Sequence, residues 1–261
     1  MQYSNVVPGR FVSRPNRFLA QVKTADGVQT CHVKNTGRCR ELLYPGAEVY
    51  LTRDDSPRRK TAYDLVTVRK GDVLVNLDSQ APNRVFYQWA LDGGFLPALR
   101  ELTPEQRYGD SRFDFAYRAG ASQGFVEVKG VTLEEDGIAY FPDAPTLRGV
   151  RHVEELCRAA AAGDEAWLCF VIPVPGVGGL RPNDRTHPAF GDALRNNQVD
   201  IGVRVELPAE VFAPITDELY ESKIVYKTEK YQDKVRTFCM NPKGAVVNEN
   251  TNGIVTVNGH S

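Results

Sequence analysis

The sequence predicts an α/β (α+β) protein in which a small β-barrel is followed by a domain with a mixed sheet flanked by helices. Three observations support this prediction. Residues 9–78 are a series of short β-type segments separated by turn residues, with almost no helical period. From residue 83 to 207, helical and strand-like segments alternate. The balance of basic and acidic residues also changes between these two parts.

The barrel is predicted from five apolar segments, at residues 17–22, 28–33, 47–52, 63–68 and 73–77. Turn signals such as Ala25-Asp-Gly27 and Tyr44-Pro-Gly46 separate them. Five or six strands in about 70 residues are typical of a small closed or partly closed barrel, and the OB type is the leading candidate.

The second domain is predicted to begin after a connector at residues 79–83. Asn83 is expected to cap a helix that stops at Gly93-Gly94, and a second turn or short helix is expected at 96–102. Strands are then expected at 106–108, 112–118, 125–133, 166–173 and 202–207, and helices at 148–162 and 188–196. This order indicates a mixed sheet.

These elements divide the chain into an OB-like domain at residues 1–80 and an α/β domain at 81–212. Residues 213–261 have no clear pattern and become rich in Asn, Gly and Val after residue 241. We expect this C-terminal extension to be an accessory segment on the surface or to be partly disordered.

The composition is that of a globular protein. Of 261 residues, 42% are hydrophobic and 25% are charged, which argues against disordered, collagen-like and coiled-coil chains. No apolar stretch approaches the roughly 18 residues of a membrane span, and residues 1–10 lack the apolar core of a signal peptide, so we expect a cytoplasmic protein. The five cysteines are scattered and are expected to be reduced, without a zinc site.

The charge is distributed unevenly. Residues 1–80 carry 13 Lys and Arg against 8 Asp and Glu, whereas the rest of the chain carries 19 against 25. A basic N-terminal domain beside an acidic domain suits a protein that contacts phosphates and also holds a cluster of carboxylates.

The chemistry is predicted at three residues in two strand-like segments. In Phe125-Val-Glu-Val-Lys-Gly-Val131, the strand period of two places Glu127 and Lys129 on the same face. Asp114 interrupts the apolar run Phe113-Asp-Phe115, which is a costly place for a carboxylate unless a cation binds it. If the two strands form a hairpin, Asp114 approaches Glu127.

Two converging carboxylates supply the oxygen ligands that Mg²⁺ or Mn²⁺ prefers, so Asp114 and Glu127 are the predicted metal ligands. Lys129 is the third predicted catalytic residue. Nearby carboxylates favour its charged form, so we expect it to position the attacking water or stabilise the developing charge, and to act as a base only if bound metal offsets those carboxylates. This Asp…Glu-x-Lys pattern resembles the PD-(D/E)-x-K signature of restriction-endonuclease-like nucleases. The alternative is an edge strand on which Glu127 and Lys129 are merely solvated.

An ordered series of motifs resembles the sugar fermentation stimulation protein A (SfsA) family over most of residues 9–207. The motifs are Asn35-Thr-Gly-Arg38, Leu43, Pro45-Gly46, Val75-Asn76, Asp78-Ser-Gln80, Pro82-Asn83, Ser111-Arg-Phe-Asp-Phe115, Phe125-Val-Glu-Val-Lys-Gly130 and Phe141-Pro-Asp-Ala-Pro-Thr-Leu-Arg-Gly149. The resemblance implies an OB-like domain, a nuclease-like domain with Asp114, Glu127 and Lys129 at its site, and an association with DNA. One departure is that the first helix of the nuclease-like domain offers only Gln88, where many nucleases of this fold have a metal-binding Glu.

Further candidate residues precede and begin the helix predicted from residue 148. Asp143 is expected to be a supplementary metal ligand or an acceptor that orients the ligands, or else simply a turn residue. Arg148, Arg151 and His152 share one face of the helix and are expected to contact the scissile phosphate, with pairing to nearby acids as the alternative.

In the barrel, Arg38 and the Arg58-Arg59-Lys60 segment are the predicted nucleic-acid contacts. Interleaved aromatic residues in the same domain are expected to lie mostly in the core, and they are Phe18, Tyr44, Tyr50 and Tyr63.

The leading hypothesis is a nuclease that uses Mg²⁺ or Mn²⁺ to hydrolyse phosphodiester bonds, with DNA expected as partner ahead of RNA. The alternative is a DNA-binding regulator of sugar (maltose) metabolism that does not cut. A third hypothesis, an enzyme acting on a sugar or other small metabolite, has no motif in its favour. The sequence leaves the oligomeric state open.

Overall fold

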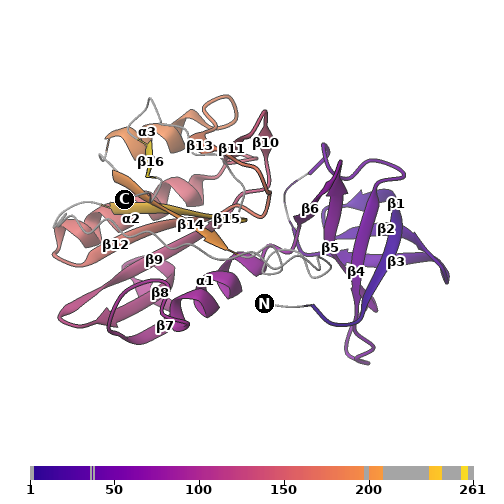
Figure 1. Cartoon of the computed structure of the whole chain (residues 1–261), viewed down its shortest axis with the longest axis horizontal. Coiled ribbons are helices and arrows are strands. Elements are labelled where there is room, and N and C mark those ends of the chain that lie inside the picture. The colour runs from indigo at the N-terminus through magenta and orange to yellow at the C-terminus, as the bar shows by residue number, and fades with distance from the viewer. Residues whose placement is uncertain are drawn as a thin grey trace.

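A β-barrel and a larger α/β domain lie side by side in the protein (Figure 1). The computed structural model describes residues 3–35, 37, 39–196, 200–207, 235–242 and 254–257. The sheet of the barrel ends at Asn76, and the first helix of the second domain begins at Ala81. A short connector therefore links the two domains.

Five strands close the barrel, and a sixth extends its sheet. Antiparallel pairing joins β3, β2, β1, β4, β5 and β6 in that order, and parallel pairing of β3 with β5 closes the ring. Alternate side chains such as Val22, Val49 and Leu65 are fully buried inside it. The strands are β1 (Val6–Asn16), β2 (Leu19–Thr24), β3 (Gly27–Val33), β4 (Glu48–Arg53), β5 (Tyr63–Lys70) and β6 (Val73–Asn76).

Strand β1 is the element of the barrel that the sequence pattern missed. It contains Pro8 and Pro15, and proline within an apolar segment normally argues against a strand. Pro8 faces Tyr50 of β4, whereas the pairing of β1 with β2 begins only at Arg10. Because only one side of β1 is paired at Pro8, the missing N–H is tolerated there.

The second domain contains a seven-stranded mixed sheet in the order β16-β14-β15-β12-β9-β8-β7. Strands β7 to β9 form an antiparallel meander, and the strands beyond β9 run parallel to it. The sheet consists of β7 (Leu99–Tyr108), β8 (Ser111–Ala119), β9 (Ser122–Gly130), β12 (Glu165–Val171), β14 (Asp200–Leu207), β15 (Val235–Pro242) and β16 (Ile254–Val257). A small second sheet contains β10 (Glu134–Glu135), β11 (Ile138–Phe141) and β13 (Gly179–Pro182).

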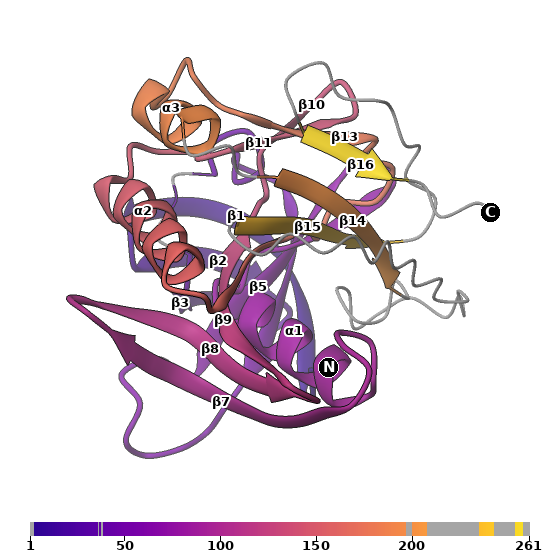
Figure 2. The ribbon, with the colours of Figure 1, turned by 90° about the vertical axis from the view of Figure 1, so that its left-hand side faces the viewer.

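Three helices complete the described part of this domain, namely α1 (Ala81–Leu91), α2 (Leu147–Ala161) and α3 (Pro188–Asn196). Helices α1 and α2 cover opposite faces of the sheet (Figure 2). Alternation along β12 explains this arrangement, because Leu168 packs in the cluster that contains Leu156 of α2, and Cys169 packs in the cluster that contains Phe86 of α1. None of the helices in the described residues is long and apolar enough to cross a membrane.

The ends of α1 and α2 compare differently with the sequence prediction. The Thr146 side chain accepts a hydrogen bond from the Gly149 N–H, which confirms it as the N-cap of α2. Asn83, in contrast, is not the N-cap of α1, because the helix begins after Gln80 and Asn83 lies inside its first turn. Of the turn or short helix expected at residues 96–102, only a turn at 97–98 is present, because β7 begins at Leu99.

The chain beyond residue 212 contributes to the sheet. Strand β15 runs parallel to both β12 and β14 and lies between them. Residues 235–242 therefore belong to the interior of the sheet, and the expectation of a surface extension is wrong for this segment. The local sequence around it carries no turn or periodic signal that indicated this pairing.

Candidate functional site

The three residues predicted to carry the chemistry meet where β8 and β9 separate. The antiparallel pairing of the two strands runs from Ala119↔Ser122 to Phe115↔Val126. Asp114 is the next residue of β8, and Glu127 is the next residue of β9. The predicted hairpin is present, and it brings these two carboxylates together at the end of the paired region.

Asp114 is held by donors from two elements. Its Oδ1 accepts a hydrogen bond of 2.8 Å from Asn83 Nδ2 of α1, and its Oδ2 accepts one of 2.7 Å from the Val128 main-chain N–H. The Asp114 carboxylate thus accepts the Val128 N–H of β9 in place of a main-chain carbonyl. Burial, together with the nearby charge of Glu127, raises the pKa of Asp114 above its usual range.

Glu127 is an almost fully buried carboxylate with one satisfied oxygen. Its Oε1 accepts hydrogen bonds from Lys129 Nζ and from His152 Nδ1 of α2. Burial acts to raise the pKa of Glu127, but Lys129 and His152 together outweigh it and lower the pKa. The second oxygen, Oε2, is buried and has no hydrogen-bond partner among the described residues.

The hydrogen bonds of His152 determine which ring nitrogen carries the proton. Arg148 Nε lies 3.2 Å from His152 Nε2, and arginine can only donate. His152 Nε2 is therefore the acceptor, and Nδ1–H is the donor to Glu127. Lys129 Nζ lies 3.3 Å from the same Nδ1, so two donors converge on Glu127 Oε1.

Asp114 and Glu127 are the residues of this site whose side chains have the chemistry to hold a divalent cation. Asp114 and Glu127 repel each other, and the unpartnered Glu127 Oε2 offers an acceptor for a cation. Among the described residues, no group of three or more His, Cys, Asp or Glu side chains is arranged to hold a metal. Two carboxylates nevertheless suit Mg²⁺ or Mn²⁺, since Mg²⁺ usually keeps several waters and is bound by one or two carboxylates together with substrate phosphates.

Of the other residues predicted around this site, some lie in the hydrogen-bond network of Glu127 and others lie outside it. Arg148 and His152 join the network of Glu127, whereas Arg151 is exposed and makes no hydrogen bond or ion pair within the described residues. The buried stripe of α2 passes through His152, so Arg151 lies outside the contact with the sheet. Asp143 does not reach the two carboxylates and lines a cavity between the domains. The structure therefore does not bring Arg151 or Asp143 into the network of the two carboxylates, and their roles as phosphate contact and supplementary ligand stay predictions.

Asn83 is the residue of the site that sequence reasoning assigned wrongly. Its position after Pro82 suggested a helix cap, and only the packing of α1 against the end of β8 shows that its amide binds Asp114. Gln88 of the same helix is exposed. The one signal that the sequence offered was a polar side chain in the first turn of a helix whose other polar residues are Arg84 and Gln88.

The basic residues predicted in the barrel lie in different environments. Arg58 and Lys60 are exposed in the loop between β4 and β5. Arg59 instead forms ion pairs with Asp64 and with Asp54, so it is tied to its own domain and is not free to contact nucleic acid as predicted. Arg38 lies outside the described residues.

Two aromatic residues expected in the core lie on the surface. The side chains of Phe18 and Tyr44 are 46% and 53% exposed, whereas Tyr50 and Tyr63 are buried as expected. The Arg17 guanidinium lies over the Phe18 ring, 4.6 Å from its centroid. Phe18 lies in the turn between β1 and β2. The next residue, Leu19, pairs with His32 of β3, and His32 pairs with Asp64 at the start of β5. This turn therefore lies at the same end of the barrel as the β4–β5 loop.

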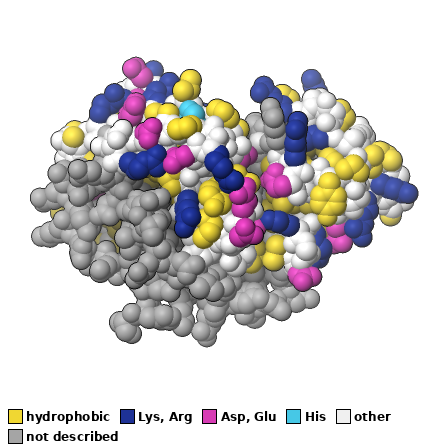
Figure 3. Space-filling model, turned by 90° about the horizontal axis from the view of Figure 1, so that it is seen from above, with side chains coloured by type: hydrophobic (Ala, Val, Ile, Leu, Met, Phe, Trp, Pro, Cys, Tyr) yellow, Lys and Arg dark blue, Asp and Glu magenta, His cyan; other side chains and the backbone are white. Residues whose placement is uncertain are grey.

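On the face shown in Figure 3, charges of both signs lie at the junction of the two domains. Lys70 of β5 and Glu134 of β10 form an ion pair of 2.5 Å across this junction. The junction therefore includes polar pairing between the two domains.

Comparison with known proteins identifies relatives of both domains. Residues 12–77 match the family model of the SfsA N-terminal OB domain, and residues 80–210 match that of the sugar fermentation stimulation protein RE domain. The chain is similar to two proteins named sugar fermentation stimulation protein homolog. The one from Desulfitobacterium hafniense (strain Y51) is 55% identical over 194 residues, covering 74% of this chain and 85% of the relative. The one from Clostridium beijerinckii is 47% identical over 195 residues, covering 75% and 86%.

Among solved structures, the chain is similar to Pyrococcus furiosus SfsA in complex with Ca²⁺. The TM-score is 0.71 at 29% identity, and the likeness covers 76% of this chain and 85% of that chain. Together with the barrel and the mixed sheet described above, these matches confirm the predicted fold class.

Proposed function

The chain belongs to the sugar fermentation stimulation protein (SfsA) family, and from this premise we propose that it binds nucleic acid and hydrolyses its phosphodiester bonds. We propose Mg²⁺ or Mn²⁺ as the cofactor, with Asp114 and Glu127 as its ligands and Lys129 as a further catalytic residue. DNA is the proposed substrate ahead of RNA.

One observation carries this proposal, namely the unpartnered Oε2 of the buried Glu127 next to the second buried carboxylate. A buried acceptor without a partner costs about 1–3 kcal/mol, and more when it is charged. A purely structural role for Glu127 does not explain why the protein retains a buried carboxylate oxygen without a hydrogen-bond partner. A cation between Asp114 and Glu127 removes it.

The residues of the chain have distinct proposed roles. Lys129 Nζ donates one hydrogen bond to Glu127, which leaves two N–H groups for the attacking water or for an oxygen of the phosphate. Asn83 and the Val128 N–H fix the orientation of Asp114, and His152 fixes that of Glu127. Each carboxylate is thus positioned before substrate binds, which lowers the reorganisation needed for catalysis.

When bound at this site, a divalent cation supplies activation of a water molecule and stabilisation of charge on the phosphate. The relative from P. furiosus was solved in complex with Ca²⁺, an ion that also takes oxygen ligands. This supports the proposal that the family binds divalent cations.

We propose that the barrel contacts the nucleic acid through two loops at one end. OB-folds bind oligonucleotides through the loops between their first and second strands and between their fourth and fifth strands. In this barrel, those loops hold Arg17 with the exposed Phe18, and Arg58 with Lys60. The cations suit phosphates, and the Phe18 ring suits base stacking.

The proposal is tested by incubating the purified protein with plasmid, single-stranded DNA and RNA in the presence of Mg²⁺, Mn²⁺ or EDTA. We expect cleavage with metal and none with EDTA. Asp114→Asn and Glu127→Gln should reduce cleavage by at least about 100-fold, since each removes charge stabilisation worth several kcal/mol, while binding persists.

Metal binding has a separate measurement. Millimolar Mg²⁺ or Mn²⁺ should raise the melting temperature of the wild type, and saturation at 100 times Kd corresponds to about 2.7 kcal/mol. Asp114→Asn and Glu127→Gln should gain little. Without a cation, Asp114→Asn relieves the repulsion between the two carboxylates and should leave the protein as stable as before or more stable, whereas Glu127→Gln should lower the stability because it loses the charge interactions with Lys129 and His152.

A second candidate function is a nucleic-acid-binding regulator of sugar metabolism that does not cut. It is favoured by the lack of a third acidic ligand near Asp114 among the described residues and by the exposed position of Gln88 on α1. Binding without cleavage of any substrate, together with a melting temperature indifferent to metal, would support this function instead of the nuclease.

A further inference from the structure

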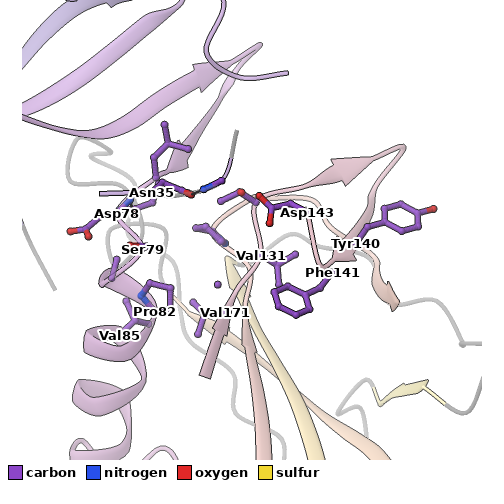
Figure 4. A pocket seen from close by; sticks show the side chains of 17 residues that line it. Asn35, Asp78, Ser79, Pro82, Val85, Val131, Tyr140, Phe141, Asp143 and Val171 are labelled. Carbon is purple, nitrogen blue, oxygen red and sulfur yellow. Dashed lines mark hydrogen bonds between the residues drawn. The ribbon is translucent and has the colours of Figure 1, made fainter. Parts of the chain in front are cut away.

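A cavity of about 200 Å³ lies between the barrel and the second domain. The N-terminal domain contributes Asn35 and Ser79 to its wall, α1 contributes Pro82 and Val85, and the sheet of the second domain contributes Val171 (Figure 4). Pockets for drug-sized ligands are roughly 300–1,000 Å³. This cavity therefore suits one flat ring system rather than a complete nucleotide.

The wall of the cavity is apolar at the bottom and polar at the rim. Pro82, Val131 and Val171 line the lower part, and Asn35 and Asp143 lie at the top, close to the point where the two domains meet (Figure 4). Among the described residues that line it there is no Lys or Arg. These residues therefore offer no cationic partner to a phosphate, whereas they offer acceptors to a neutral ring with N–H groups.

Asn35 presents a donor at the rim. Its Oδ1 accepts a hydrogen bond of 2.8 Å from the Gly37 main-chain N–H, and this bond identifies which amide atom is the oxygen. Its Nδ2 group makes no hydrogen bond within the described residues. Asn35 is half-buried, and the hydrogen bond from the Gly37 N–H holds its side chain in place.

Asp143 presents a carboxylate acceptor beside Asn35. A Cβ on Gly37 would lie 2.4 Å from Asp143 Oδ2 and 2.9 Å from Asn35 Oδ1, so both side chains lie against the same residue. No Lys or Arg of the described residues forms an ion pair with Asp143. The loop that carries it is anchored by Asn183, whose Nδ2 donates a 3.0 Å hydrogen bond to the Pro142 carbonyl.

Residues in the wall of the cavity are neighbours in the sequence of residues at the candidate catalytic site. Gly130, in its wall, follows Lys129, and Pro82 precedes Asn83, which binds Asp114. If a phosphate of a nucleic-acid strand lies at Lys129, a neighbouring base of that nucleic acid is within reach of the cavity.

From this geometry we propose that the cavity holds one unpaired base of a nucleic-acid strand, with guanine preferred. The inference rests on the proposed function. The pairing edge of guanine presents adjacent N1–H and N2–H donors beside the O6 acceptor. Asp143 accepts from the donors and the Asn35 amide donates to O6, while Pro82 and Val131 contact the ring. Thymine offers one N–H donor on this edge, and hypoxanthine lacks the N2 amine.

The test compares three labelled single-stranded oligonucleotides by fluorescence anisotropy in EDTA at low salt. One is all dT, one carries a single central dG, and one carries deoxyinosine at that position. A well-placed pair of hydrogen bonds to a base gives about fivefold discrimination or more, so the wild type should bind the dG strand at least about fivefold more tightly than either other strand.

Near-isosteric variants assign the preference to the cavity. Asp143→Asn and Asn35→Asp should each reduce the preference for dG towards unity, and Asn35→Asp still accepts from the Gly37 N–H. The matched control is Asp136→Asn, an exposed residue of the β10–β11 turn that loses the same charge outside the cavity. It should keep the full preference. Melting temperatures equal to that of the wild type show that the variants are folded.

The outcomes separate this inference from the function on which it rests. If none of the strands binds the wild type, binding of single-stranded DNA is refuted and this inference falls with it, while cleavage of plasmid or RNA still tests the proposed function. Tight binding of all three strands without preference, or a preference unchanged by Asp143→Asn and Asn35→Asp, overturns only the role of the cavity. Free guanosine that raises the melting temperature as much as the dG strand at equal concentration would assign the cavity to a free nucleoside and overturn the proposal.

Discussion

At the scale of single residues, Glu127 shows how a charge is retained inside this protein. Its side chain is only 3% exposed, and an isolated ion in such a place costs several kcal/mol. Lys129 and His152 offset part of that cost through Oε1, but Oε2 remains without a partner among the described residues. The unpartnered oxygen of Glu127 lowers the stability of the fold, and it lies where the proposed function requires a charged group.

Asn83 is predicted to be a positioning residue. Asn83→Ala removes the donor that orients Asp114, and the loss of such a supporting hydrogen bond typically reduces metal affinity or activity about 10- to 100-fold. We expect a loss of this size in the cleavage rate, together with a smaller rise of melting temperature on adding Mg²⁺ or Mn²⁺. Gln88→Ala, at an exposed position of the same helix, is the control and should behave as wild type. An unchanged metal response in Asn83→Ala would show that its bond to Asp114 is only structural.

At the scale of elements, the β4–β5 loop combines an anchored residue with two exposed cations. Asp64, at the start of β5, is buried and pairs with Arg59 of the loop and with Lys34, whose Nζ lies 2.9 Å away. Arg58 and Lys60, on either side of Arg59, are exposed. The anchor fixes the loop, and its neighbours are free to contact a ligand.

Replacing Arg58 and Lys60 together by Ala should weaken the dependence of nucleic-acid affinity on salt. Each phosphate contact contributes about 0.9 to the slope of log K against log salt on duplex DNA, or about 0.7 on a single strand, so the slope should fall by up to about twice that amount. Arg100→Ala with Arg107→Ala, which removes two exposed cations of β7, is the matched control. A slope equal to that of wild type would exclude the loop as a contact.

Asp64 should make the barrel sensitive to acid. Burial acts to raise its pKa, but the hydrogen bonds from Arg59 and Lys34 outweigh this and lower the pKa. Its ionised form therefore stabilises the fold above the unfolded pKa of about 3.9, and this contribution is lost as the pH falls through the lower folded value. Asp64→Asn should reduce the free energy of unfolding by about 1–3 kcal/mol at pH 7, and the difference should shrink below about pH 4. Denaturant melts at pH 7 and pH 3 measure this, and a difference independent of pH would contradict it.

At the scale of the whole molecule, the two domains share a continuous hydrophobic core. One cluster of buried side chains includes Leu77 of the connector, residues inside the barrel such as Leu51, and residues under α2 such as Leu156. The ion pair of Lys70 with Glu134 also joins the domains. The junction therefore resembles a packed interior more than a flexible linker.

This shared core predicts that the barrel and the second domain unfold together. Calorimetry should show a single transition in which the calorimetric and van't Hoff enthalpies agree. Lys70→Ala removes only a partly exposed ion pair, so it should lower the stability by at most about 1 kcal/mol and leave one transition. Two resolved transitions in the wild type would show that the apolar contacts at the junction are too weak to couple the domains.

The sequence by itself determined the features that depend on local pattern. Alternation of period two placed Glu127 and Lys129 on one face of a strand, and the short turn between residues 119 and 122 formed the hairpin that brings Asp114 near them. Thr146 was identifiable as a helix cap because capping involves only neighbours in the chain. Such features are decided by backbone geometry within a few residues.

The tertiary structure decided which groups meet across the sequence. The bond of Asn83 to Asp114, the pairing of Arg59 with Asp64, and the place of β15 between β12 and β14 all join segments whose local patterns carry no information about each other. The same holds for the cavity in which Asn35 and Asp143 lie against Gly37. Contacts of this kind depend on how helices and sheets pack in three dimensions, and packing is set by the shapes and charges of all the faces together.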